Sequence, residues 1–256
     1  MKADPVAQDA HDEELAEDEL EIELRPVHEI ARRLLILAAL AEQMTFADGE
    51  VPSPDERASS TFDLREWLRA EEIWPDLTQD EILLLAGGAQ PGEEPDQFSV
   101  QETLEALGAL AWTLRLAPDL QADLPAGVDT LIPSLPHPWD STATWMGGLE
   151  LRALDEIAVQ REAAELWTWR LLAEQDLREA FDDDRKELQE VIREAEREGR
   201  AAGVLPRGGF RVQGRDISTL NPTERNTLLA TSLARLQALN WVCGYGERWD
   251  DVPLDI

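Results

Sequence analysis

The chain has 256 residues, with 23 Lys and Arg against 54 Asp and Glu, so its formal net charge at pH 7 is −31. Such a surface repels nucleic-acid phosphates and anionic membranes; it favours basic partners or cations, or serves only to keep the protein soluble. A single cysteine excludes an intrachain disulfide and any metal site built from several cysteines. The sequence has no apolar run that could span a membrane and starts with acids rather than with a basic signal peptide, so we expect a cytoplasmic protein.

Residues 1–25 are expected to form an acidic arm, disordered or frayed, ahead of one helical domain over residues 26–256. The first 24 residues carry ten acids and one lysine. A block of like charge with few large apolar residues cannot build a core. The arm is either a solvating tail or a mimic of nucleic-acid charge.

Two helices are predicted after the arm. Apolar residues recur at spacings of three and four from residue 27 to about residue 44, which indicates an amphipathic helix. Prolines 52 and 54 are expected to follow its end. A second helix is predicted over residues 60–73, because Trp74-Pro75 disfavours helical angles at that point.

Two further helices have capping signals. Thr78 precedes Glu81 by three residues, and Ser99 precedes Glu102 by three, which is the spacing of a capping box. The first of these helices is expected to end at Gly87, before a surface loop, and the second near residue 116.

The second half combines irregular chain with the longest helical patterns. Residues 117–148 hold five prolines and are expected to cross over the helices without regular structure. Helices are predicted over residues 149–179 and 183–198, and a last one from Asn221-Pro222 until glycines break it at positions 244 and 246. The sequence therefore predicts an all-α fold: a single globular domain of six to eight helices, with a long Pro-rich crossover and a short extended arm.

Three blocks of sequence resemble a known family. They are Trp67-Leu68 with residues 77–81 and 102–114; residues 161–170; and Arg235 with residues 238–241 and 249–252. Together they resemble the bacterial family catalogued as domain of unknown function 4272, over about residues 26–256. Paired tryptophans two residues apart beside an arginine, as in Trp167-Thr-Trp-Arg170, are rare by chance. The resemblance implies a helical cytoplasmic domain with no established activity.

Histidine is too scarce for the commonest catalytic and metal sites. The chain has only His11, His28 and His137, which do not have the spacing of a zinc motif, and the glycine pairs lack the lysine and strand context of a phosphate-binding loop. We therefore predict no catalytic residue, no cofactor and no metal.

A candidate polar pocket comes from the two Trp-containing helices and the chain end. Its residues are Arg161, Glu165, Trp167, Arg235, Asn240, Trp241, Trp249 and Asp250. Guanidinium groups among tryptophans can hold a carboxylate or phosphate. Alternatively, these groups are buried hydrogen bonds and ion pairs that tie the C-terminus to the long helix, since buried charges must be paired. In either case, deleting residues 241–256 is expected to unfold the domain.

Residues 203–215 form the one basic island in the chain. They carry Arg207, Arg211 and Arg215 among glycines, without an acid, and their pattern suits a short hairpin or extended arm. This arm either docks an anion or a partner, or its arginines pair with the protein's own acidic surface.

The leading hypothesis is a non-enzymatic protein-interaction or regulatory module, of which an immunity protein is one form, with a basic protein as partner. Nucleic acid and membrane are not expected as partners, and the oligomeric state is open. The alternative is a hydrolase or transferase that uses the Arg, Glu and Asp of the candidate pocket, or a protein that binds a small anion.

Overall fold

The computed structural model describes residues 22–45, 53–86, 99–128 and 130–254. Within these residues there are eight α-helices and one two-stranded hairpin. The helices and strands are α1 (Val27–Thr45), α2 (Pro54–Ala70), α3 (Gln79–Leu85), α4 (Val100–Thr113), α5 (Thr142–Met146), α6 (Leu154–Glu179), α7 (Asp182–Ala201), β1 (Arg211–Val212), β2 (Arg215–Asp216) and α8 (Pro222–Val242). The 3₁₀ turns are η1 (Trp74–Asp76), η2 (Ile132–Ser134), η3 (Ile217–Thr219) and η4 (Trp249–Asp251). The fold is all-α, as the sequence predicts.

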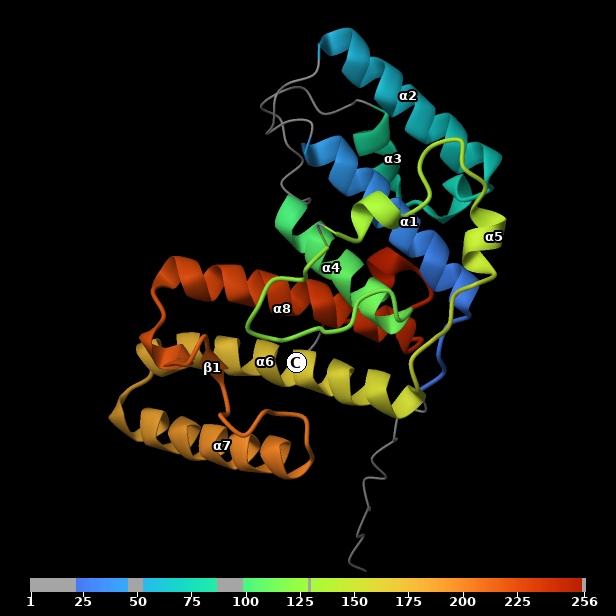
Figure 1. The fold of residues 1–256 in the computed structure, drawn as a ribbon. Coiled ribbons are helices and arrows are strands. Elements are labelled where there is room, and N and C mark those ends of the chain that lie inside the picture. The colour runs from blue at the N-terminus through green and yellow to red at the C-terminus, as the bar shows by residue number, and fades with distance from the viewer. Residues whose placement is uncertain (1–21, 46–52, 87–98, 129, 255–256) are drawn as a thin grey trace, which may run out of the picture.

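Helix α8 lies in the middle of the molecule (Figure 1). It packs between α4 and α6; α1 covers the far side of α4, and α7 covers the far side of α6. Because α8 has helices on two sides, its buried residues do not form a single stripe. The main core joins α1, α4 and α8, and a smaller cluster around Trp167 joins α6 to the hairpin and the start of α8.

Two helices begin at other positions than the sequence suggested. Helix α2 starts at Pro54, six residues early, because Ser53 and Glu56 form a capping box and proline suits the first turn. Helix α6 starts at Leu154, five residues late, because the carboxylate of Glu156 accepts a hydrogen bond from the backbone N–H of Ala153. Thr78 and Glu81 form the predicted capping box of α3, and α8 starts where expected, with Asn221 as its cap. Ser99 caps α4 by accepting from the backbone N–H of Glu102, but α4 has no full capping box there.

The crossover from residue 114 to residue 153 is mostly irregular, as expected, with α5 and one short 3₁₀ turn within it. Of the two forms expected for the basic arm, a short hairpin or an extended arm, the structure has the hairpin, in which Arg211 pairs with Asp216 and Val212 with Arg215.

The expected arm over residues 1–25 differs from the structure at its end. Residues 1–21 lie outside the described residues, but residues 22–25 pack against the end of α8, where the backbone N–H of Arg25 donates to Val242 O at 2.9 Å. Gly244 makes this contact possible: its φ is +86°, and a Cβ there would lie 2.7 Å from Glu23 O. No helix of the described chain is both long and apolar enough to cross a membrane.

Candidate functional site

Three residues of the candidate pocket meet between α6 and α8. Arg161 Nε donates to Asn240 Oδ1 at 2.8 Å, and Arg161 forms an ion pair with Glu165 at 3.0 Å. Asn240 Nδ2 in turn donates to Pro253 O at 2.9 Å. This network therefore connects the long helix, the last helix and the C-terminal segment.

Arg235 lies in a different network. Its guanidinium is buried and contacts Glu105 of α4, with Nη2 2.6 Å and Nε 2.9 Å from Oε2. It also donates to the carbonyls of Gln121 and Leu124 in the crossover. Glu105 is not among the residues that the sequence analysis singles out.

Trp167 also lies away from the other candidates. Its ring packs edge-on against Phe210 at 5.4 Å between centroids, inside the second hydrophobic cluster. Its partner in the Trp-Thr-Trp motif, Thr168, is fully buried and donates its hydroxyl to Ala164 O. Trp167 and Thr168 of the motif therefore belong to the interior of the protein.

The two C-terminal tryptophans meet each other and two arginines from the N-terminal part. Trp241 and Trp249 pack edge-on at 5.6 Å. Arg25 lies over Trp241 at 4.5 Å, and Arg33 lies over Trp249 at 4.2 Å. Arg33 is 2% exposed and forms a two-point ion pair with Glu81 of α3. Arg33 is not among the residues named in the sequence analysis. The signal that could have pointed to this buried pair is an arginine within the apolar stripe of the first helix.

Asp250 contacts Arg248, two residues before it in sequence, with Oδ2 2.8 Å from Nη2. This hydrogen bond lowers the pKa of the Asp250 carboxyl below its ordinary value.

None of the three cavities described next is lined by Arg161, Glu165, Arg235 or Asn240. The structure thus distributes the candidate pocket over separate networks.

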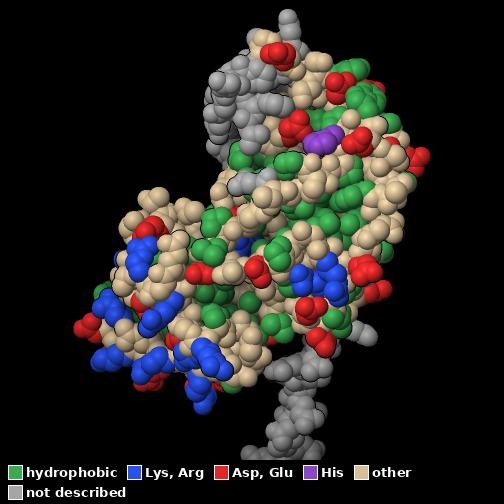
Figure 2. Space-filling model, in the orientation of Figure 1, with side chains coloured by type: hydrophobic (Ala, Val, Ile, Leu, Met, Phe, Trp, Pro, Cys, Tyr) green, Lys and Arg blue, Asp and Glu red, His purple; other side chains and the backbone are tan. Residues whose placement is uncertain are grey.

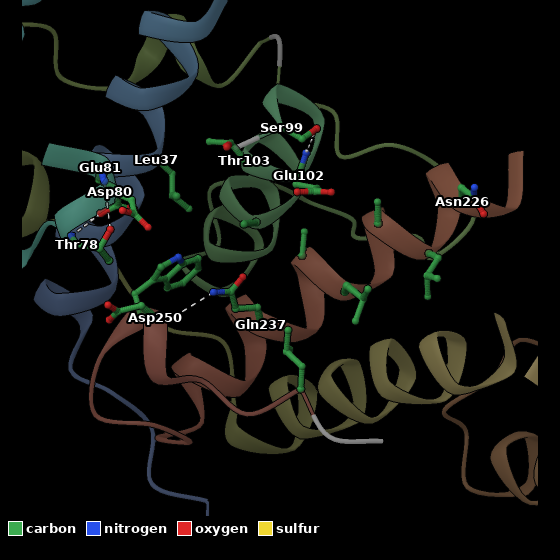
Figure 3. A pocket seen from close by; sticks show the side chains of 17 residues that line it. Leu37, Thr78, Asp80, Glu81, Ser99, Glu102, Thr103, Asn226, Gln237 and Asp250 are labelled. Carbon is green, nitrogen blue, oxygen red and sulfur yellow. Dashed lines mark hydrogen bonds between the residues drawn. The ribbon is translucent and has the colours of Figure 1, made fainter. Parts of the chain in front are cut away.

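The first cavity is a groove of about 470 Å³ between α4 and α8, closed at one end by α3 and η4. We call it the acidic groove (Figure 3). Its apolar lining is Leu37, Ala106, Leu229, Ala230, Leu233, Ala234, Trp249 and Leu254. Its acids are Asp80, Glu81, Glu102 and Asp250, and no Lys or Arg is among its described lining residues.

The charges of the acidic groove differ in how they are paired. Arg33 neutralises Glu81, and Arg248 pairs with Asp250. Asp80 and Glu102 have no cationic partner among the described residues. Partial burial raises the pKa of the Glu102 carboxyl above its ordinary value.

The second cavity, of about 490 Å³, lies on the other side of Trp249. It is rich in arginine, but each guanidinium has a carboxylate partner. The pairs are Arg25 with Glu29, Arg32 with Asp76, Arg33 with Glu81, and Arg248 with Asp250. This cavity therefore has no excess of positive charge.

The third cavity, of about 530 Å³, lies beneath the hairpin arm. Arg207 and Arg211 line it, whereas Arg215 points elsewhere and forms an ion pair with Glu224 at 2.8 Å. Arg170, which the sequence analysis names only as part of the family motif, and Arg200, which it does not name, complete its basic lining.

Among the residues that the structure describes, no group of three or more His, Cys, Asp or Glu side chains is arranged to hold a metal ion. Cys243 is buried, and burial raises the pKa of its thiol to about 11 although the charge of Arg161 acts in the opposite direction.

No curated protein and no solved structure matches the chain. A family model matches residues 10–194, which hold the first two of the three resembling blocks and leave the C-terminal block outside. The chain belongs to the family described as Domain of unknown function (DUF4272).

Proposed function

We propose that the protein is a non-enzymatic binding module that holds a basic, amphipathic helical segment of a partner protein in the acidic groove. The observation that carries this proposal is the pairing state of the groove: an apolar floor bordered by Asp80 and Glu102, both without a cationic partner among the described residues. A helix with one apolar face and lysines or arginines at its edges complements both features.

The shape of the groove supports a helical occupant. Side chains of α8 line it along several turns, from Asn226 to Gln237, and those of α4 face them (Figure 3). Leu229 and Leu233 are half-buried and one helical turn apart, so they offer neighbouring apolar contacts to a ligand.

The charge of Glu102 supports a cationic occupant. The raised pKa means that partial burial makes the ionised form of Glu102 less well solvated than it would be in free water. A lysine or arginine placed beside it would restore a favourable partner, and the net charge of −31 would speed the approach of a basic protein. A regulatory or immunity-type role, in which the partner is inhibited by being bound, is the form of this function that the acidity favours.

The enzyme alternative lacks support from the geometry. It requires Arg161, Arg235 and Asp250 around one substrate. These residues contact Asn240, Glu105 and Arg248 respectively, and they share no cavity described above.

The experiment is a titration of the full chain with an amphipathic leucine–lysine peptide of about four helical turns, at near-physiological salt. We expect Glu102→Gln to weaken binding about fivefold to tenfold, since one charge-assisted contact is lost. Leu233→Ala should weaken it by a similar factor through the apolar contact. Glu187→Gln, on the exposed face of α7, removes the same charge far from the groove and should change the affinity less than twofold.

Equal effects of Glu102→Gln and Glu187→Gln would show that the peptide binds to the acidic surface in general, and the groove would then be rejected as the site. Absence of binding to the wild-type protein at near-physiological salt would also overturn the proposal.

A further inference from the structure

We propose that the third cavity, between α6, α7 and the hairpin arm, binds a small molecule that carries a phosphate dianion. This site is separate from the acidic groove and does not depend on it. Figure 2 shows several Lys and Arg side chains, with Asp and Glu among them, over the part of the molecule where α7 and β1 lie in Figure 1; a second group of Lys and Arg lies at the right of the view.

The charge of the cavity favours an anion. Its charged lining residues are Arg170, Arg200, Arg207, Arg211, Glu196 and Asp216. Glu174 does not line the cavity but pairs with Arg170, so four cations face three anions and leave one positive charge in excess, inside a chain whose overall charge is strongly negative. At physiological salt the screening length is about 8 Å, so the nearby arginines outweigh the distant acids for a ligand in the cavity.

Two of the four arginines are available to a ligand. Arg207 and Arg211 are exposed and form no ion pair or side-chain hydrogen bond with the described residues. The other two are held in place: Arg170 pairs with Glu174 at 3.0 Å, and Arg200 pairs with Glu196 at 2.8 Å. Planar guanidinium groups bind phosphate oxygens through two parallel hydrogen bonds, which favours arginine at such sites.

The acids of the cavity are already engaged. Glu196 contacts Arg200, and Asp216 accepts hydrogen bonds from the backbone N–H and the hydroxyl of Ser218. Together with the charges of Arg170 and Arg211, these bonds lower the pKa of the Asp216 carboxyl. Neither acid therefore neutralises Arg207 or forms an ion pair with Arg211 in the free protein.

The backbone of the arm is seated by a glycine. Gly209 has φ of +68°, and a Cβ there would lie 1.7 Å from Glu196 Oε1. This close contact between the arm and the Glu196–Arg200 pair fixes the residues on either side of Gly209, and so holds Arg207 and Arg211 at the cavity.

The experiment measures binding of inorganic phosphate and pyrophosphate to the full chain by calorimetry, with chloride at matched ionic strength as the blank. We expect saturable binding of one equivalent. The double variant Arg207→Gln/Arg211→Gln should lose about tenfold or more in affinity. Both side chains are exposed, so the fold should persist, which circular dichroism would verify.

Arg215→Gln is the matched control. It removes one arginine charge, where the double variant removes two, from the same arm, but at a residue that pairs with Glu224 outside the cavity. Its affinity for pyrophosphate should stay within about twofold of the wild type. Equal losses in Arg215→Gln and in the double variant, or no saturable binding of either anion to the wild type, would overturn the proposal.

Discussion

Arg235 and Glu105 form a buried ion pair between α8 and α4, with 2.6 Å between Nη2 and Oε2 and both side chains at most 3% exposed. The carboxylate also accepts from the backbone N–H of Ala126, and the guanidinium donates to two carbonyls of the crossover. One pair thus fastens the irregular crossover to the two helices beneath it. Its groups satisfy one another, as a structural pair requires.

Arg235→Ala should lower the free energy of unfolding by about 3–5 kcal/mol, because it leaves the Glu105 carboxylate buried without its cation. Urea unfolding followed by circular dichroism measures this change. Arg193→Ala is the matched control: its pair with Glu190 on α7 is exposed, so the loss should stay below about 1 kcal/mol. Similar losses in both variants would contradict a stabilising role for the buried pair.

Trp249→Ala should destabilise the protein by about 2 kcal/mol, because it removes the contacts with Trp241 and Arg33 that hold η4 against the core. Trp139→Ala removes the same side chain at a position that is 61% exposed, and should change stability by no more than about 0.5 kcal/mol. Thermal melts of the two variants test this prediction.

Deletion of residues 241–256 removes buried Trp241, Val242 and Cys243, and should abolish the cooperative melt altogether.

Much of the fold could be predicted because its signals are local. Capping residues such as Thr78 and Asn221, and proline at the first turn of α8, act within one turn of the chain. Where prediction erred, two local signals competed. Pro54 can follow one helix or begin the next, and the Ser53–Glu56 capping box makes it a start.

The arrangement of the candidate site was less predictable, because it depends on which helix faces which. Arg161 and Asn240 meet because α6 and α8 are neighbours. Arg235 is only five residues from Asn240, yet it faces α4. Five residues rotate a helix by about 500°, so the two side chains point about 140° apart around the axis. Glu105 and Arg33 lie within apolar stripes. A single charged residue in such a stripe predicts a buried partner of opposite charge, but the sequence does not show which residue that partner is.

The thiol of Cys243 should be unreactive in the folded protein. Burial raises its pKa to about 11, so almost no thiolate exists at pH 8, and the side chain is 1% exposed. Labelling with a chromogenic disulfide should be slow in buffer and complete in guanidinium chloride. Rapid labelling of the native protein at pH 8 would contradict the packing of the chain end.

The same thiol should make stability depend on pH in the alkaline range. The pKa is higher in the folded state than in the unfolded state, so its contribution is fully present below the unfolded pKa near 9 and is lost as the pH rises towards 11. The wild type should therefore lose up to about 2 kcal/mol relative to Cys243→Ala over this range, at roughly 1.4 kcal/mol for each unit of pKa shift. A difference in the free energy of unfolding between the wild type and Cys243→Ala that stays constant over this pH range would contradict the prediction.

Replacing Glu102 by glutamine should stabilise the free protein, although Glu102 is the residue that we expect to attract the ligand. Its pKa is raised by burial, so its contribution to stability is present below the unfolded pKa and is lost as the pH rises through the folded pKa. At pH 7 Glu102→Gln should exceed the wild type in stability by less than about 1 kcal/mol, since the groove is open to water. The difference should vanish near pH 4, whereas Glu187→Gln should show no such dependence. A Glu102→Gln variant that is less stable at pH 7 would indicate a structural carboxylate, and would remove the reason for placing a cation beside it.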